Sequence, residues 1–133
     1  ITCRDWSSDV CSSDLVTYLK VDRAEAEFLT GIADLRKAAE KLHSIGPREI
    51  VLTESSGVTV FANGDFYTAP FNPRSLKGRT GRGDTCFSTY IATRLSLDPA
   101  EACRWAGQVT SLKQEIPGPW KGSAEEVARL LAN

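Results

Sequence analysis

Two periodicities of apolar residues divide the first part of the chain into predicted strands and helices. Residues 16–21 alternate and are rich in β-branched side chains, which predicts a strand. Asp22 follows as a helix N-cap, and Gly31 is placed to end a short helix. A second helix is predicted from about residue 33 to Gly46, because apolar side chains recur along one helical stripe: Leu35, Ala38, Ala39, Leu42 and Ile45.

An apolar run and a turn signal follow these helices. Residues 49–53 form a compact apolar strand of the kind that is buried between two layers of helices. Asn63 and Gly64, a strong short signal for a β-hairpin, separate apolar residues 58–62 from 66–69. The order of strand, helices, strand and hairpin indicates an α/β sheet with antiparallel strands at one edge.

The second half of the chain is predicted to be helical after a polar loop. The loop covers residues 72–83 and leads into a helix from Asp84 to about residue 97, whose inward side chains we expect to be Phe87, Ile91 and Leu95. Residues 98–101 combine an Asp cap, a Pro at the first helical position and a capping-box Glu for the next helix. Ser123 caps a terminal helix.

Composition and charge narrow the class of protein. The chain has 133 residues, 41% of them hydrophobic and 25% charged, which is typical of a globular protein. A formal charge of −1 argues against nucleic-acid binding, and the lack of about eighteen consecutive apolar residues argues against a membrane-spanning helix. Cys86 and Cys103 lack the spacing of metal ligands, which favours a reduced, cytoplasmic protein.

The N-terminal segment differs from the rest of the chain. Residues 5–15 correspond to a nucleotide string that resembles a common short-read sequencing adaptor translated in frame. We therefore set residues 1–15 apart as an artefact that does not pack against the fold, and take residues 16–133 as the folded part. Because an adaptor would interrupt the coding sequence, we expect the chain to be a fragment.

The most informative segment is rich in glycine. Gly78, Gly81 and Gly83 allow the backbone to approach a ligand, and the helix that follows presents unpaired N–H groups to the same place. This arrangement favours an anion such as phosphate. It is not a Walker phosphate loop, because Asp84 stands where that motif needs Lys, and it is not a dinucleotide fingerprint, because Cys86 stands at the third glycine position.

Asp84 itself has two alternative roles. Beside an anion site, its carboxylate could accept the proton of a substrate hydroxyl while N–H groups hold a transferring phosphoryl group. It could instead only cap its helix. The residue pattern alone leaves both roles open.

Several segments resemble one family in the same order along the chain. Residues 81–84, Gly-Arg-Gly-Asp, resemble the Gly-Ala-Gly-Asp signature of ribokinase-like (PfkB) sugar kinases. Residues 20–31 resemble the strand, the Asn-x-x-Glu element and the Leu-Thr-Gly end of that family. Residues 50–53 fall where a strand leads to the nucleotide loop, and residues 117–119 are similar to some members. The resemblance covers residues 16–133, roughly the C-terminal half of such a kinase.

The resemblance implies a role for each matching position. Asp84 is the expected catalytic base, beside an anion hole made by the backbone amides of Gly81, Arg82 and Gly83. Thr53 and Gly57 are expected to contact the nucleotide, and Glu25 to order the water around a magnesium ion.

The chain also departs from the family pattern at several positions. Arg82 replaces the usual Ala of the signature, and Gly78 and Arg79 stand where the family often has Asp-Thr. Asp22 replaces the usual Asn of the Asn-x-x-Glu element. The nucleotide turn, residues 53–57, lacks the first Gly of the family and is one residue short.

The resemblance implies a truncated ribokinase-like three-layer α/β sandwich that contains only the C-terminal half. The intact protein is expected to transfer a phosphoryl group from ATP, with Mg²⁺, to a hydroxyl of a sugar or related small molecule. Alternatives are a nucleoside kinase of the same fold and a catalytically inactive, nucleotide-binding fragment. We expect a cytoplasmic enzyme that binds neither nucleic acid nor membrane, an intact protein that forms a homodimer, and a fragment without turnover of its own.

Overall fold

Within residues 17–78 and 80–132, which the computed structural model describes, the chain forms one four-stranded sheet. In order across the sheet, the strands are β1 (Tyr18–Asp22), β2 (Glu49–Thr53), β3 (Gly57–Ala62) and β4 (Asp65–Pro70). β1 and β2 are parallel, whereas β3 pairs antiparallel with both β2 and β4. The predicted sheet with antiparallel strands at one edge is confirmed.

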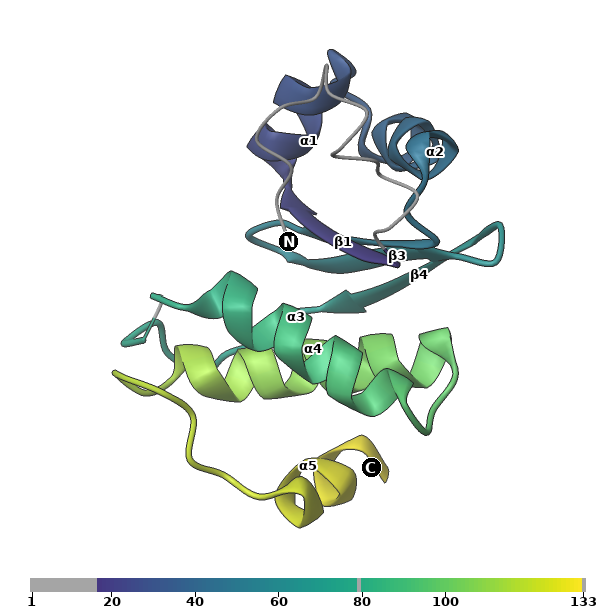
Figure 1. Cartoon of the computed structure of the whole chain (residues 1–133). Helices are drawn as coiled ribbons and strands as arrows, with labels where there is room; N and C mark the ends of the chain where they lie inside the picture. The colour runs from purple at the N-terminus through teal and green to yellow at the C-terminus, as the bar shows by residue number, and fades with distance from the viewer. Residues whose placement is uncertain (1–16, 79, 133) are drawn as a thin grey trace.

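Helices cover both faces of the sheet, which gives three layers (Figure 1). One face carries α1 (Arg23–Thr30) and α2 (Leu35–Ile45), which connect β1 to β2. The opposite face carries α3 (Arg82–Arg94) and α4 (Pro99–Gln114). The terminal helix α5 (Ala124–Ala132) lies outside α4 and away from the sheet. The parallel strands β1 and β2 need a long crossover, which the two helices supply, whereas a short turn is enough to join the antiparallel strands β3 and β4.

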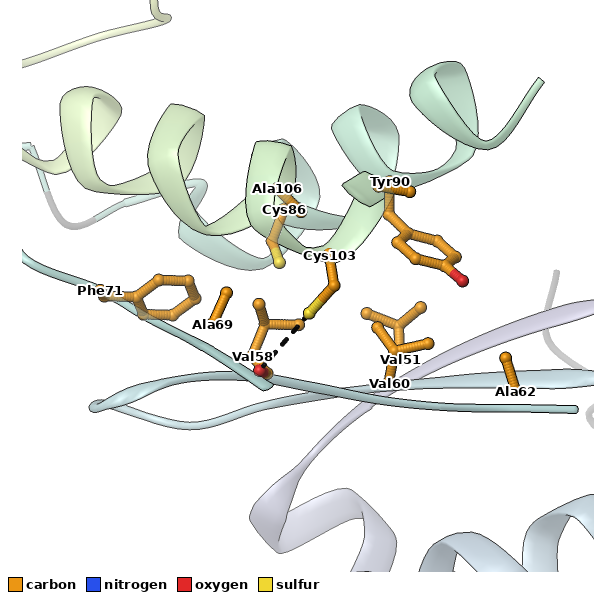
Figure 2. Packing of buried hydrophobic residues seen from close by; sticks show 11 residues of the cluster. Val51, Val58, Val60, Ala62, Ala69, Phe71, Cys86, Tyr90, Cys103 and Ala106 are labelled. Carbon is orange, nitrogen blue, oxygen red and sulfur yellow. Dashed lines mark hydrogen bonds between the residues drawn. The ribbon is translucent and has the colours of Figure 1, made fainter. Parts of the chain in front are cut away.

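The two faces of the sheet have separate hydrophobic cores. Ile50 and Leu52 of β2 pack toward α1 and α2, whereas Val51 between them packs toward α3 and α4. Every residue of β2 is buried, because successive side chains point to opposite faces and both faces are covered. Figure 2 shows the second core, where the thiol of Cys103 lies 3.9 Å from the carbonyl oxygen of Val58.

Predicted helix ends are largely confirmed. Asp22 and Glu25 form a reciprocal capping box at the start of α1, and Gly31 ends that helix in a left-handed conformation with φ 73°. Asp98 accepts the N–H of Glu101 at 2.9 Å at the start of α4, with Pro99 in the first turn. Asn63 has φ 54° in the hairpin turn, as the Asn-Gly signal predicts.

The predicted start of α3 is wrong, and its predicted inward face is correct only in part. The helix begins at Arg82 rather than Asp84, and its fully buried side chains are Cys86 and Tyr90. Phe87, predicted to face inward, is partly buried and packs against the core. Leu95, also predicted to face inward, is 86% exposed, because it follows the last helical residue. Small and polar side chains occupy much of this helix and weaken its apolar pattern, so the sequence periodicity missed the fully buried positions.

Two further predictions concern Ile45 and the N-terminal segment. Ile45, placed in the buried stripe of α2, is 40% exposed, because it is the last residue of that helix before the Gly46 turn. The predicted artefact at residues 1–15 lies outside the described residues. None of the described helices combines the length and the apolar character that crossing a bilayer requires.

Candidate active site

The N-terminus of α3 presents backbone N–H groups that the helix itself does not use. Gly81 is the N-cap, with φ 82° and ψ 10°, and no side chain caps the helix. The N–H of Thr85 donates to the carbonyl of Gly81 at 3.0 Å and makes the first helical hydrogen bond. The N–H groups of residues 82–84 have no helical acceptor by geometry, so they are available to an anion.

Gly78, at the other end of this segment, is held against the last turn of α4. Its N–H donates to the carbonyl of Gln114 at 2.8 Å, and its carbonyl accepts a hydrogen bond from Nζ of Lys113 at 2.9 Å. A Cβ atom at position 78 would overlap the carbonyl group of Ile116. Only glycine allows the two backbones to lie this close together.

Two cationic side chains lie near the start of α3. Lys20 comes from β1, and its Nζ is 2.9 Å from the place where a Cβ atom would lie at position 83. Arg82 is the first residue of the helix and is half-buried. Both charges lower the pKa of the Cys86 thiol, which places them at the same helix end. Their charge adds to the positive end of the helix dipole and favours anion binding.

The Cys86 thiol is not a nucleophile at this site. Burial raises its pKa to about 11, a larger effect than the lowering by Lys20 and Arg82. The thiol is therefore protonated at neutral pH, whereas nucleophilic attack needs the thiolate. The reactive groups of this helix end are the N–H groups, the two cations and the carboxylate of Asp84.

Asp84 lies in the first turn of α3 and is exposed. Among the described residues, its carboxylate takes part in no hydrogen bond or ion pair. The alternative that Asp84 caps its helix is wrong, because the cap is Gly81 and no side chain accepts a capping hydrogen bond. Within the described part of the chain, therefore, no side chain or backbone group competes with a bound molecule for this carboxylate.

Glu25, the expected contact of a magnesium ion, is already engaged in local structure. Its Oε2 accepts the N–H of Asp22 at 2.8 Å and lies 3.9 Å from Nζ of Lys20. No group of three or more His, Cys, Asp or Glu side chains is placed to hold a metal within the described parts of the chain. Mg²⁺ commonly keeps several of its waters when it binds to protein, so the half-exposed carboxylate of Glu25 suits contact through water.

Thr53 and Gly57, the expected nucleotide contacts, flank the turn between β2 and β3. Thr53 lies opposite Asp22 in the parallel pair, at the carboxyl edge where ligands bind in open α/β sheets. A Cβ atom at Gly57 would lie 2.5 Å from the carbonyl oxygen of Ala69, so the glycine is required by strand packing. No hydrogen bond between described residues joins this turn to residues 81–84.

Sequence reasoning did not single out Lys20 or Lys113. Lys20 connects two expected elements, because it lies beside both Glu25 and Gly83. Its only sequence signal is its place two residues before Asp22, on the same face of β1. Lys113 stands among buried positions of α4, where a lysine in an apolar stripe was the available signal.

These features describe an α/β protein in which a helix N-terminus presents unused N–H groups beside an exposed carboxylate that has no partner among the described residues. The chain belongs to the PfkB family: the family model described as pfkB family carbohydrate kinase matches residues 4–119. The matched range includes part of the segment 1–15 that the sequence analysis set apart. A search of curated proteins gave no match.

Solved structures show the same fold. A pyrophosphate-dependent kinase in the ribokinase family, complexed with a pyrophosphate analog and myo-inositol, is 39% identical, with a TM-score of 0.78 over 89% of this chain and 42% of that chain. Arabidopsis thaliana ribokinase complexed with ribose and ATP is 23% identical, with a TM-score of 0.79 over 90% of this chain and 42% of that chain. The 2-dehydro-3-deoxygluconokinase of Thermotoga maritima is 22% identical, with a TM-score of 0.76 over 91% of this chain and 43% of that chain. The fold is ribokinase-like, and the chain spans less than half the length of these structures.

Proposed function

We propose that the intact protein transfers a phosphoryl group to a hydroxyl of a sugar or related polyol, and that this chain carries the donor-phosphate site and the catalytic base. One observation carries the proposal: the exposed carboxylate of Asp84, which has no partner among the described residues, lies in the first turn of a helix whose first N–H groups have no helical acceptor. Lys20 lies against Gly83 at the same helix end. Membership of a carbohydrate kinase family supports the reaction class.

In the proposed reaction, the chain supplies positioning and charge. The amides of Gly81, Arg82 and Gly83, together with Lys20, hold the transferring phosphoryl group and its developing negative charge. Asp84 accepts the proton of the acceptor hydroxyl as the oxygen attacks phosphorus. The bond between the phosphoryl group and the rest of the donor breaks, and the donor remainder leaves with the bonding electrons.

A magnesium ion, when bound, neutralises charge on the donor phosphates. Glu25 would contact it through water, because Oε2 of Glu25 already accepts the N–H of Asp22. The side chain of Lys20, between Glu25 and Gly83, links this position to the anion site.

Two donors are consistent with this anion site. ATP is the first candidate, with Thr53 and Gly57 near the nucleotide, and solved ribokinase-family structures carry it. Inorganic pyrophosphate is the second candidate, because pyrophosphate-dependent kinases are 38% to 39% identical to this chain, against 19% and 23% for the ATP complexes. Both donors present a terminal phosphoryl group, so residues 81–84 serve either one.

The experiment that tests the function uses the full-length enzyme. Phosphorylated products are followed by ³¹P NMR with ATP or pyrophosphate as donor, and with ribose, fructose, myo-inositol or a nucleoside as acceptor. We expect transfer to a sugar or cyclic polyol. Transfer only to nucleosides would favour the nucleoside kinase alternative. Nucleotide binding without transfer to any acceptor would favour the binding-only alternative and contradict the proposal.

Cytoplasmic location and assembly of the intact protein as a homodimer stay predictions. So does the absence of turnover in the 133-residue chain alone, which is checked in the same assay.

A further inference from the structure

Lys113 is a buried cation next to the proposed anion site. The residue is 3% exposed, on the face of α4 that is covered by the rest of the fold. Its Nζ donates to the carbonyl of Gly78 at 2.9 Å. Among the described residues, no carboxylate forms an ion pair with it, whereas Lys20, Arg23, Arg94 and Arg104 each have such a partner.

A buried ammonium group without a carboxylate partner is costly. Removing the charge from water is unfavourable, and a single carbonyl oxygen satisfies only one of its three N–H donors. The C-terminal end of α4 compensates part of this cost through its dipole. A neutral side chain of similar length would fill the same space without the cost of desolvating a charge. Packing alone therefore does not explain why this position carries a positive charge.

The lysine side chain lies beneath the segment that leads to α3. Its Cε is 3.7 Å from the place of a Cβ atom at Gly81, and its Nζ contacts Gly78. The next residue, Gln114, accepts the N–H of Gly78, is 2% exposed and has a side-chain nitrogen without a partner in the described structure. The last turn of α4 therefore holds this segment through its backbone and brings one fixed positive charge under it.

We propose that Lys113 is a positioning residue for the phosphoryl donor: its buried charge, acting through Gly78 and Gly81, strengthens binding of the donor phosphates at the N-terminus of α3. The inference rests on the proposed function and adds a further cation to the anion site, besides Lys20 and Arg82. The ligand chemistry is that of a polyphosphate terminus, which pyrophosphate and a nucleoside triphosphate share. Lys113 binds the carbonyl of Gly78 and orients the segment, and it does not contact the donor.

A purely structural role makes a different prediction from a charge role. If Lys113 only anchors Gly78, then Gln at this position, which can donate a hydrogen bond, restores donor binding. If the charge matters, only Arg restores it. A charge effect also grows with ligand charge, so the loss is larger for pyrophosphate than for inorganic phosphate.

The test measures binding of sodium pyrophosphate, inorganic phosphate and ATP to the 133-residue chain by isothermal titration calorimetry. All the residues that the inference involves lie in this chain. Lys113→Met is expected to weaken pyrophosphate binding about tenfold and phosphate binding less, as expected for loss of a charge-assisted interaction. Lys113→Arg keeps most of the affinity, and Lys113→Gln does not. The control Lys41→Met removes an exposed charge on α2, across the sheet, and leaves affinity unchanged.

The outcomes separate this inference from the proposed function. If the wild-type chain binds none of the three ligands at millimolar concentration, the donor site itself fails, and the inference with it. If the wild type binds and Lys113→Gln binds equally well, only the charge role of Lys113 is overturned. Thermal unfolding is recorded for each variant. Should Lys113→Met not fold, the comparison of Arg with Gln decides the question.

Discussion

The two ends of α3 each have a carboxylate nearby, and the two carboxylates are in opposite states. Near the C-terminal end, Glu49 of β2 is 6% exposed and accepts hydrogen bonds from Tyr90 at 2.5 Å and from Nε of Arg94 at 3.1 Å. At the N-terminal end, Asp84 is exposed and has no partner among the described residues. The carboxylate near one end of the helix is thus buried and hydrogen-bonded, whereas the carboxylate at the other end is exposed and has no described partner.

This difference separates a structural group from a reactive one. Burial, followed by the hydrogen bond to Glu49, raises the pKa of Tyr90, so its hydroxyl stays a donor over the whole physiological range. Arg94 also donates to the carbonyl of Leu97 at 3.0 Å, which ties the end of α3 to the start of the following turn. Glu49 is buried and its oxygens already accept hydrogen bonds within the fold, so a substrate does not reach it, whereas the exposed carboxylate of Asp84 is accessible to a bound molecule.

The largest expected effect is on catalysis at the N-terminal end of α3, where Asp84 lies. Asp84→Asn in the intact enzyme keeps the side-chain size but cannot accept a proton, so kcat should fall about a hundred- to ten-thousand-fold. Since Asp84 caps nothing, Tm and donor affinity should stay nearly unchanged. Steady-state kinetics and thermal unfolding check both parts. A turnover close to that of the wild type would remove the main support for the kinase mechanism.

The second largest expected effect is on stability, near the C-terminal end of α3, where Glu49 pairs with Arg94. Glu49→Gln leaves the guanidinium of Arg94 without its ion pair, which is 3.0 Å long, and should lower the unfolding free energy by about 3 kcal/mol. Glu54→Gln is the matched control: it breaks the more exposed pair with Arg23 and should cost less than about 1 kcal/mol. Urea unfolding of the 133-residue chain measures both. Equal losses of unfolding free energy in the two variants would mean that the buried pair of Glu49 and Arg94 is no more important for stability than the exposed pair.

The smallest effect concerns Cys86, which lies in α3 between the two ends. Its pKa is raised by burial from 9.0 to about 11, so its stabilising contribution is present below pH 9 and is lost as pH rises through 11. Between pH 8 and 10, wild-type unfolding free energy should fall by about 1 kcal/mol more than that of Cys86→Val. Urea unfolding at several pH values tests this. Parallel pH profiles would mean that the thiol is in contact with water.

Local structure was predictable to a large extent from short segments of sequence. β2 has the predicted bounds, the Asn63-Gly64 hairpin forms, and Asp22, Asp98 and Gly31 occupy the predicted cap positions. These features depend on interactions within a few residues, which the local sequence contains. The inward face of α3 was predictable only in part: Phe87 packs against the core as expected, but packing against both β2 and α4 buries Cys86 and Tyr90 more completely.

The candidate site divides in the same way. The glycines, Arg82 and Asp84 were visible as one continuous segment of sequence, and their resemblance to a family signature indicated a phosphoryl-transfer site. Whether Asp84 was a cap or a free carboxylate depended on where the helix began, which the sequence left open. The structure answers this with Gly81 as the cap.

The sequence by itself determined the kinds of elements, most of their ends, the class of fold and the chemistry of the glycine segment, because each rests on local conformational preference or on a continuous motif. Only the tertiary structure decided that Lys20 from β1 and Lys113 from α4 flank that segment, and that Glu49 is engaged while Asp84 has no partner within residues 17–78 and 80–132. Charge acts through space over short distances. Its partners therefore depend on which distant elements the fold brings together.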